Sequence, residues 1–402
     1  MKLLFVFSAI PPYLDALLNK ISAKGQEVVV AIAAKESTVI GKGVKIVDEH
    51  KSDYKLIPTR EATSILGKKF FPDLYNIIES EKPDILIAGW PYFLALSFQP
   101  KLRRAIKRNK VRVAIREIPF QTPPYGRIKE YFDLHPMYDE DMNLQSQGLA
   151  FYTRQWVVMN IRRYCYKLAD GALAYSSVGK DIMPTYGVDK ELVFVTYNTG
   201  NSEALMLEKE NVIASKPILP HNANRIIHIG RLVKWKRVDL LIDSFAIVLE
   251  KYPHAELVVV GDGPEREALE LMAQNMGIEQ NIIFVGAIYD PIMIGAYMHS
   301  SSVYVLAGMG GLSINDAMAY GLPVICSVCD GTEKDLIEDG VNGFFFEEGN
   351  KHDLANKIVT LFENPAQLKN MGQEALRVIE EKINLETVSN RYINALNKIN
   401  SL

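Results

Sequence analysis

Cysteine is scarce in this chain of 402 residues, which contains only Cys165, Cys326 and Cys329. Three cysteines cannot build the disulfide framework of a small secreted protein, and they suit a reducing compartment. Cys326 and Cys329 form a CxxC that ends an apolar run, without a second ligand pair or a nearby histidine pair. We therefore expect a structural role for this pair rather than a zinc or redox site.

Long apolar runs are also absent. No stretch approaches the roughly 20 apolar residues that a transmembrane helix needs. The first ten residues, MKLLFVFSAI, carry one lysine and an apolar core of the minimum length for a signal peptide. Because a turn and a helical pattern follow, we interpret this segment as a buried first strand. A cytoplasmic location is expected.

Charge of one sign does not dominate the sequence either. The 45 Lys and Arg residues nearly balance the 48 Asp and Glu residues, which gives a net charge of -3. This balance argues against a protein that coats nucleic acid. The charge is unevenly distributed, at +7 over residues 1–200 and -10 over residues 201–402. The split indicates two halves that face different partners.

Short runs rich in Val, Ile and Leu alternate with helical stretches over most of the chain. Twelve of these runs are predicted strands: 2–10, 27–34, 83–90, 111–118, 171–177, 193–198, 225–230, 255–261, 281–286, 302–308, 322–327 and 343–348. Runs without alternation are typical of parallel strands that helices cover on both faces. The pattern predicts an α/β protein with two doubly wound, Rossmann-like domains.

A polar segment that contains proline and has no strand pattern marks the domain boundary. We expect a first domain over residues 1–202, a linker over 203–224, a second domain over 225–383 and a final helix over 384–402. Doubly wound folds bind ligands at the carboxyl ends of their strands. With two such domains, the natural site is the cleft between them.

Cations follow the first strand of the second half. Arg231 and Lys236 come just after that strand. Two cations at a strand end suit a diphosphate, with Arg as a fork and Lys as a point charge, although a solvated loop would have a similar composition. After the second strand, Gly261 and Gly263 allow a sharp turn, but the GxGxxG of a NAD site is absent.

A glycine-rich loop follows the fourth strand of the second half. Gly308, Gly310 and Gly311 lead into a helix that we expect to begin near Ser313. A glycine-rich loop that leads into a helix N-terminus is a ready anion site. Asp316 would lie in the first turn of this helix, where the helix dipole alone already favours a carboxylate.

The order and spacing of these segments resemble the nucleotide-sugar domain of retaining GT-B glycosyltransferases of family four, the glycosyl transferases group 1. The resemblance runs through GRLVKWKRVDLLIDSFA, VVVGDGPEREAL, NIIFVGAI, GLSINDAMAYGLPVI and DGTEKDLIEDGVNGFFF. It implies the GT-B fold, in which two Rossmann-like domains face each other across a cleft. It also implies a retaining hexosyltransferase whose donor is a nucleotide-diphosphate sugar and which uses neither a metal nor a cofactor.

The resemblance assigns roles to individual positions. Arg231 and Lys236 would contact the donor diphosphate and stabilise the charge of the leaving group, and Asp316 would hold the ribose. Glu333 matches another glutamate of the family, although an acid early in a helix needs no such role. The remaining donor-binding positions that it implies are Gly230, Gly261, Gly263, Ile288 (beside the base), Gly310, Gly311, Leu312 and Ser313.

One departure from the family concerns a pair of glutamates eight positions apart. The second aligns with the shorter Asp316 and the first with Gly308. Three functions stay open: a transferase that holds the sugar differently, a nucleotide-sugar epimerase of the same design, and an inactive nucleotide-sugar-binding partner subunit.

The first half resembles the family less closely, mainly over residues 168–200. A histidine that is common after the middle strand is replaced by Arg116 and Glu117. Glu117 either lines the acceptor site or forms an ion pair with Arg116 or another cation. The implied acceptor is a saccharide or a lipid-linked saccharide, as in surface polysaccharide or glycolipid biosynthesis.

The positive charge of the first half is concentrated in two segments. Residues 101–112 contain seven cations, and residues 151–169 contain four cations and five aromatic residues, with no acid in either. Cationic, aromatic helices can lie in a membrane interface, whereas a solvated helix face and a core-packed helix are the alternatives. We expect peripheral contact with an anionic membrane at its cytoplasmic face.

A DxD triplet, Asp139-Glu140-Asp141, spells the metal motif of the other glycosyltransferase fold. In that fold the motif follows a strand of the nucleotide-binding domain. Here it lies in a polar segment of the half that lacks the donor signature. We therefore do not expect a metal site there.

Overall fold

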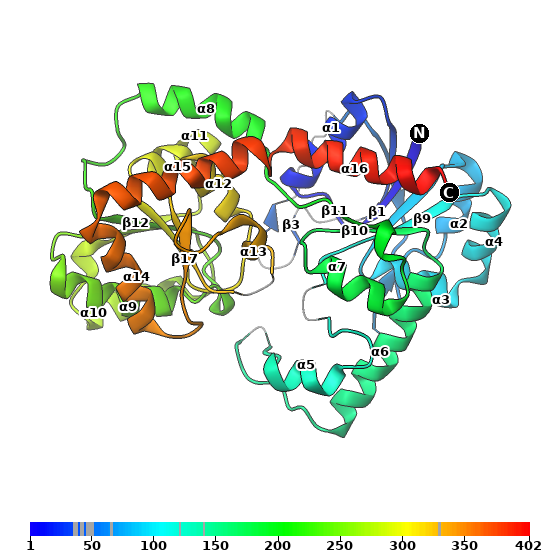
Figure 1. Ribbon diagram of the computed structural model, residues 1–402, viewed down its shortest axis with the longest axis horizontal. Coiled ribbons are helices and arrows are strands. Elements are labelled where there is room, and N and C mark those ends of the chain that lie inside the picture. Colours follow the sequence, from blue (N-terminus) through cyan, green and yellow to red (C-terminus); the bar gives the residue numbers. More distant parts are fainter. Residues whose placement is uncertain are drawn as a thin grey trace. The chain divides into compact units, whose positions relative to one another are not determined.

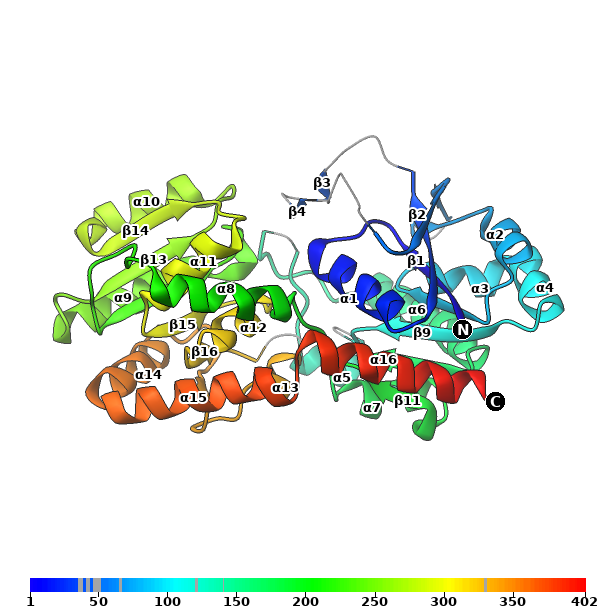
Figure 2. The same cartoon turned by 90° about the horizontal axis from the view of Figure 1, so that it is seen from above.

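The computed structural model describes residues 1–34, 52–64, 67–119, 122–139, 141–328 and 331–402, together with the backbone of 39–40 and 44–45. It divides into two compact units. The first unit comprises Met1–Tyr138, Leu144–Asn198 and Leu385–Leu402, and the second comprises Asp139–Asn143 and Thr199–Asn384 (Figures 1 and 2). Cys329 and Glu140, which belong to the CxxC and DxD motifs, lie outside the described residues.

The first unit is built on a parallel sheet of seven strands in the order β11-β10-β9-β8-β1-β2-β5. Its strands are β1 (Lys2–Phe7), β2 (Glu27–Ala33), β5 (Lys55–Thr59), β8 (Ile85–Gly89), β9 (Arg112–Glu117), β10 (Gly171–Ala174) and β11 (Val193–Val195). Six of them confirm predicted runs. The sequence analysis missed β5, an edge strand that contains Pro58 and is only partly buried, because it has no continuous apolar run.

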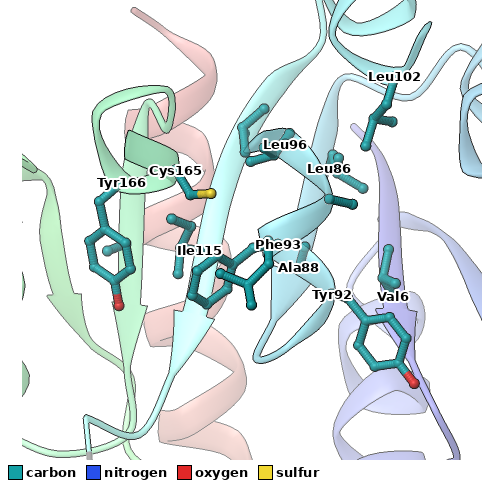
Figure 3. Close-up of a cluster of buried hydrophobic side chains, with 14 of the residues drawn as sticks. Val6, Leu86, Ala88, Tyr92, Phe93, Leu96, Leu102, Ile115, Cys165 and Tyr166 are labelled. Atoms are coloured by element: carbon teal, nitrogen blue, oxygen red, sulfur yellow. The ribbon is translucent and has the colours of Figure 1, made fainter. Parts of the chain in front are cut away.

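Helices cover both faces of this sheet. They are α1 (Pro12–Ala23), α2 (Leu74–Glu81), α3 (Ala95–Phe98), α4 (Pro100–Arg108), α5 (Ile128–Leu134), α6 (Leu149–Lys167), α7 (Gly179–Ile182) and α16 (Leu385–Asn400), with the 3-10 turns η1 (Tyr92–Leu94), η2 (Met183–Tyr186) and η3 (Lys190–Leu192). The core between sheet and helices includes Phe93 and Tyr166, whose rings pack edge to face (Figure 3). Two short hairpins, β3–β4 (Val39–Ile40, Val44–Lys45) and β6–β7 (Ala62–Thr63, Lys69–Phe70), lie outside the sheet.

The second unit has a parallel sheet of six strands in the order β14-β13-β12-β15-β16-β17. Its strands are β12 (Arg225–Ile229), β13 (Glu256–Val260), β14 (Ile282–Gly286), β15 (Val303–Leu306), β16 (Val324–Cys326) and β17 (Gly343–Phe345). All six were predicted. Counted along the chain, the order is 3-2-1-4-5-6, which is that of a Rossmann fold. The α/β class with two doubly wound domains is thereby confirmed.

The helices of the second unit pack on both faces of its sheet. They are α8 (Ser202–Ala214), α9 (Val238–Lys251), α10 (Arg266–Asn275), α11 (Pro291–His299), α12 (Ser313–Ala319), α13 (Glu333–Leu336), α14 (Lys351–Glu363) and α15 (Pro365–Glu381), with the 3-10 turns η4 (Lys234–Lys236) and η5 (Glu279–Asn281). The buried core is mainly aliphatic, with Phe245 fully buried at its centre. Cys326 ends β16 and is buried.

The segment expected to be a linker differs from the prediction. Most of residues 203–224 belong to helix α8, which begins at Ser202 and packs against α11 and α12 of the second unit. The Asn201 side chain caps the helix by accepting a hydrogen bond from the amide of Ala204. Within α8 only Ser202, Leu205 and Val212 are buried, so the sequence carries almost no apolar periodicity. The final helix, α16, belongs to the first unit.

A helix that crosses a bilayer must be both long and apolar. No helix in the described part of the chain meets both conditions. The longest helix of the first unit, α6, carries Arg and Lys residues along its length.

Candidate functional site

The strand order of the second sheet reverses next to β12, which lies between β13 and β15. Ligands of doubly wound sheets bind outside the carboxyl ends of the strands at this reversal. The loops after β12 and β15 meet here, because the amide of Met309 donates to the carbonyl of Trp235 over 2.8 Å. The cationic segment and the glycine-rich loop, which are 70 residues apart in the sequence, are therefore joined at the expected place.

Lys236 lies in this junction and is buried, with an exposed fraction of 8%. Its Nζ donates to the carbonyl oxygens of Met309 at 2.8 Å and Gly310 at 2.7 Å. Lys236 is therefore not a solvated loop residue. Lys234 is one, since it is exposed and lies 3.6 Å from Asp141. The structure gives Lys236 a role in holding the glycine loop in place.

Arg231 is half-buried beside Lys236. Its guanidinium lies 5.6 Å from the centre of the Trp235 ring, within the range of a cation–π contact. Stacking on an aromatic face restricts the side chain while its in-plane N–H groups keep their directions. The two cations predicted to bind a diphosphate thus lie on one loop at the reversal point of the sheet.

Gly261 and Gly263 allow the strand-end loops to pack backbone against backbone. A Cβ on Gly261, which has a φ of +150°, would lie 1.8 Å from the carbonyl oxygen of Gly230. A Cβ on Gly263 would lie 2.3 Å from that of Leu232, whose amide donates to the Asp262 carbonyl. These contacts account for both glycines through packing, and their assignment to donor binding stays a prediction.

Gly308 also lies against backbone. A Cβ there would be 2.3 Å from the carbonyl oxygen of Trp235 and 2.6 Å from the carbonyl carbon of Lys236. No side chain fits at this position while the loops after β12 and β15 are joined. A side chain at this position, which the resemblance aligns with the first family glutamate, would therefore clash with the backbone of the loop after β12.

Replacement of Gly308 by alanine should destabilise the protein by about 1–3 kcal/mol, the usual cost of overpacking a tight contact. Urea unfolding would measure this change. Gly148→Ala is the matched control, because a Cβ there would meet nothing closer than 4.0 Å. Equal stability of Gly308→Ala and the wild type would show that the two loops do not pack as described.

The glycine loop ends at the short helix α12 (Ser313–Ala319). Its first amides have no acceptor within the helix, as at every helix start. The Oγ of Ser313 accepts a hydrogen bond from the Tyr304 hydroxyl at 2.7 Å, which fixes this side chain from the sheet below. Gly310 and Leu312 are half-buried and Gly311 is exposed. The loop therefore offers backbone amides at the reversal point, next to the two cations.

Asp316 lies within α12 and is partly buried. A Cβ on Gly200 would be 3.2 Å from its Oδ1, so the carboxyl group lies close to the backbone at the start of the second unit. Burial raises the pKa of the Asp316 carboxyl to about 7. The carboxyl group is therefore close to half-ionised at neutral pH.

Donor affinity should rise between pH 6 and pH 8 if Asp316 accepts hydrogen bonds from ribose hydroxyls. An ionised carboxylate accepts such bonds more strongly, and this group loses its proton as the pH passes its pKa of about 7. Calorimetric titration of a nucleotide sugar across this range would measure the effect. Asp316→Asn should remove the pH dependence, and an unchanged profile in that variant would contradict the role.

Two other predicted positions also follow strands of the second sheet. Ile288 comes after β14 and is half-buried. Glu333 begins α13 after β16 and is 1% exposed, and its Oε1 accepts a hydrogen bond from the amide of Gly331 at 3.1 Å. Full burial is unusual for a carboxylate. A favourable position early in a helix does not require it, so the helix position alone does not explain the burial of Glu333.

His228 was missed by the sequence analysis. It lies within β12, fully buried, and its Nδ1 is 3.0 Å from the carbonyl oxygen of Val305. Burial lowers the pKa of His228 to about 4, so the ring is neutral. Its Nε2, which has no hydrogen-bond partner among the described residues, faces Gly230 near Lys236. The signal was available, since a histidine interrupts the apolar run RIIHIG.

Glu117 of the first unit forms an ion pair, but not with Arg116. It is buried at the end of β9, where Arg162 Nη1 donates to its Oε1 over 2.5 Å and the Tyr166 hydroxyl donates to its Oε2. Glu117 and Arg162 also line a pocket of about 490 Å³. Both interpretations of Glu117 are therefore compatible with its position: it is an ion-paired residue in the wall of a pocket.

Asp139 and Asp141 of the DxD triplet are joined by a hydrogen bond. Asp139 Oδ1 accepts hydrogen bonds from the amides of Asp141 and Asn143 at 2.9 and 2.8 Å. These bonds, the one from Asn143 above all, hold the pKa of the Asp139 carboxyl below its usual value. Within the described ranges, no three His, Cys, Asp or Glu side chains are grouped as a metal site would require. The independence from metal stays a prediction.

The second unit is similar in sequence to a known protein family. Residues 210–378 match the family described as glycosyl transferases group 1. The second unit belongs to this glycosyl transferase family. A poly(ribitol-phosphate) alpha-N-acetylglucosaminyltransferase of Staphylococcus aureus is 30% identical over 173 residues, or 42% of this chain and 34% of that protein. An alpha-monoglucosyldiacylglycerol synthase of Streptococcus pneumoniae is 25% identical over 270 residues, or 65% of this chain and 60% of that protein.

Solved structures extend the similarity of this chain over both units. HepE of Anabaena in complex with UDP has a TM-score of 0.67 at 19% identity, with 99% of this chain and all of that chain covered. A glycosyltransferase from Rickettsia africae has a TM-score of 0.68 at 16% identity, with 99% of this chain and 98% of that chain covered. The chain has the GT-B fold of these proteins. By sequence, it spans 34% to 62% of the length of the curated relatives that it matches.

Proposed function

We propose that this protein is a glycosyltransferase that moves a sugar from a nucleotide-diphosphate sugar to a saccharide or lipid-linked saccharide. The observation that carries the proposal is the junction of the Arg231–Lys236 loop with the Gly308–Ser313 loop at the reversal point of the second sheet. The family match of this unit supports it. So do the solved complexes of HepE with UDP and with UDP-glucose.

In the proposed reaction, the bond between the anomeric carbon and the diphosphate breaks while an acceptor hydroxyl bonds to that carbon. Negative charge then builds on the leaving phosphate, which receives the hydroxyl proton. Arg231 and the amides before α12 would stabilise this charge, and Lys236 would keep those amides in place and add its own charge. The resemblance to family four favours retention of the anomeric configuration.

The acceptor belongs to polysaccharide or glycolipid chemistry under this proposal. Relatives named as a capsular polysaccharide biosynthesis glycosyltransferase and as an alpha-monoglucosyldiacylglycerol synthase support that class. The epimerase alternative would need further acid and base groups around the sugar. At the position of the missing glutamate, the packing around Gly308 leaves no room for one.

Product analysis tests the proposal against its alternatives. The protein would be incubated with a panel of nucleotide-diphosphate sugars, with and without saccharide and glycolipid acceptors. The expected result is release of nucleoside diphosphate with a glycosylated acceptor, and with the configuration of the donor by NMR. A changed sugar without an acceptor would identify an epimerase, and binding without any turnover would identify the partner subunit.

We further propose that the first unit contacts an anionic membrane through α5, α6 and residues 135–138 and 144–148 between them, called here the α5–α6 projection. In Figure 1, α5 and the first part of α6 extend away from the sheet and from α4 of the same unit, while the second part of α6 packs on the core. Its exposed apolar side chains include Leu134, Leu144, Leu149 and Trp156, at 72%, 63%, 86% and 58% exposure. The exposed Arg154 of α6 is positively charged, and the exposed acids Glu130 and Asp133 of this region lie on α5.

Three of the seven cations in the other basic segment, residues 101–112, form hydrogen bonds or ion pairs within the first unit. Arg103 donates to the carbonyl oxygens of Leu96 and Ser97. Arg108 pairs with Glu79, and Arg112 Nη1 lies 2.8 Å from a carboxylate oxygen of Asp170. These three cations stabilise the unit itself, whereas Lys101, Arg104, Lys107 and Lys110 are exposed. We place the membrane contact on the α5–α6 projection because that region also exposes apolar side chains.

Vesicle flotation tests the membrane contact. At low salt, the wild type should float with vesicles that contain phosphatidylglycerol and not with pure phosphatidylcholine. Leu149→Ser should weaken binding by about tenfold, because one apolar side chain would no longer be buried in lipid. Leu271→Ser is the matched control, since Leu271 is 55% exposed on α10 of the second unit. Failure of the wild type to bind anionic vesicles would refute this contact.

A further inference from the structure

The first sheet also has a reversal point, next to β1, which lies between β2 and β8. The pocket of about 490 Å³ lies within the first unit at the carboxyl ends of β1, β8 and β9. Its walls include Phe7 and Ser8 after β1, Trp90 after β8, and Arg116 at the end of β9. This is the place where a doubly wound sheet binds a ligand.

Arg116 is the unusual residue of this pocket because its charge has no carboxylate partner among the described residues. It is 7% exposed. Its Nε donates to the Tyr392 hydroxyl of α16 at 2.7 Å. Its Nη2 is buried and has no hydrogen-bond partner in the described part of the chain. The neighbouring Glu117 is already engaged by Arg162 and Tyr166.

Aromatic rings surround Arg116 without satisfying it. The guanidinium carbon lies 4.3 Å from the centre of the Tyr175 ring, 5.3 Å from that of Phe7 and 6.0 Å from that of Tyr392. Ring faces stabilise the cation, but they do not accept its in-plane N–H groups as an oxygen would. A buried charge with an open donor is expensive, so the arrangement suits an anion that supplies the oxygen.

The surroundings of the pocket favour negative charge as well. Lys68 lies 5.3 Å from the centre of the Trp90 ring, which is part of the pocket wall. Burial lowers the pKa of Lys68, and the nearby positive charges of Arg154 and Arg162 lower it further. A cluster of cations that disfavour one another is stabilised when an anion joins them.

We propose that this pocket binds an anionic group of the acceptor, a phosphate or a carboxylate, with Arg116 as the residue that recognises it. That the bound molecule is the acceptor rests on the proposed function, whereas the binding of an anion rests on the geometry of the first unit. It narrows the acceptor from any saccharide to one that carries an acidic group. A guanidinium fork binds both oxyanions through paired N–H groups.

Calorimetric titration of the full chain with methyl phosphate and with acetate tests the anion site. The wild type should bind at least one of them, and Arg116→Gln should weaken that binding by at least about tenfold, the usual effect of losing a charge-assisted hydrogen bond. Arg104→Gln is the control, since it removes an exposed cation from the same unit. Arg116→Lys keeps the charge and should retain part of the affinity if the glutamine variant does not fold.

Further arms separate the possible outcomes. In Arg231→Ala, the part of methyl phosphate binding that depends on Arg116 should remain, and Arg116→Gln should leave nucleotide-sugar binding unchanged, so failure of the proposed function is seen independently. Competition by vesicles that contain phosphatidylglycerol, but not by free glycerol phosphate, would identify a lipid headgroup as the source of the anion, and the reverse would identify a free phosphate. Absence of binding by either anion, or equal binding by Arg116→Gln, would overturn the proposal.

Discussion

Replacement of Arg231 or Lys236 by alanine should lower kcat/KM for sugar transfer by about 10²–10³-fold, the usual loss when one group that stabilises the transition-state charge is removed. The two variants should differ in a second property. Arg231 is half-buried against the Trp235 ring, so its removal should lower stability only slightly. Lys236 bonds two carbonyl groups of the glycine loop, so its removal should also lower stability.

The control for this pair is Lys234→Ala. Lys234 belongs to the same loop and carries the same charge, but it is exposed and pairs with the exposed Asp141. A surface pair of this kind contributes roughly 0–1 kcal/mol, so the variant should keep wild-type turnover. Steady-state rates with the donor identified in the product analysis would measure all three variants. Near-normal turnover of either Arg231→Ala or Lys236→Ala would contradict the assignment of this loop to the donor site.

Replacement of Arg162 by alanine should destabilise the protein by about 3–5 kcal/mol, because it leaves the buried charge of Glu117 without its partner. The two side chains are 8% and 5% exposed, and their pairing is supported by the Tyr166 hydroxyl. The Arg162 guanidinium also lies 4.5 Å from the centre of the Trp90 ring. Removal of the side chain would therefore open the wall of the pocket as well.

Urea and thermal unfolding would measure this loss. The informative comparison is the double variant Arg162→Met with Glu117→Gln, which removes both charges and keeps most of the volume. It should recover much of the stability that Arg162→Ala loses, since no unpaired charge is left. If the double variant is no more stable than the single one, the loss comes from packing rather than from the buried charge.

The fold was largely predictable from the sequence because parallel strands covered on both faces leave a strong signal. All twelve predicted runs are strands of the two sheets, among them the run VVV in Glu256–Val260. The edge strand Lys55–Thr59 escaped because half of it faces away from the core and Pro58 interrupts it. Helix α8 escaped for a related reason, since too few of its residues are buried to give a period.

The donor-side site was partly predictable. The order of strands and loops placed the Arg231 segment and the glycine loop after neighbouring strands, and the structure joins them. The burial of Lys236 could not be read from the sequence, because a lysine between Trp and Arg looks solvated. The reason for Gly308 was also hidden, since only the approach of the Trp235 carbonyl shows that a side chain is excluded.

The acceptor side was less predictable because its groups come from distant segments. Glu117 and Arg162 are 45 residues apart, and Arg116 and Tyr392 are 276 apart. Their adjacency in the sequence suggested a pair between Arg116 and Glu117, but neighbours in a strand point to opposite faces. Glu117 instead pairs with side chains of α6, and Arg116 donates a hydrogen bond to a side chain of α16.

Calorimetric titration with a panel of nucleotide-diphosphate sugars tests the central claim most directly, namely that the loops after β12 and β15 bind the donor. The account predicts that the wild type, Lys234→Ala and Arg116→Gln bind the same nucleotide sugar with similar affinity, and that Arg231→Ala binds it at least about tenfold more weakly. If the wild type binds no nucleotide sugar, or if Arg231→Ala binds it as tightly as the wild type, the account is contradicted.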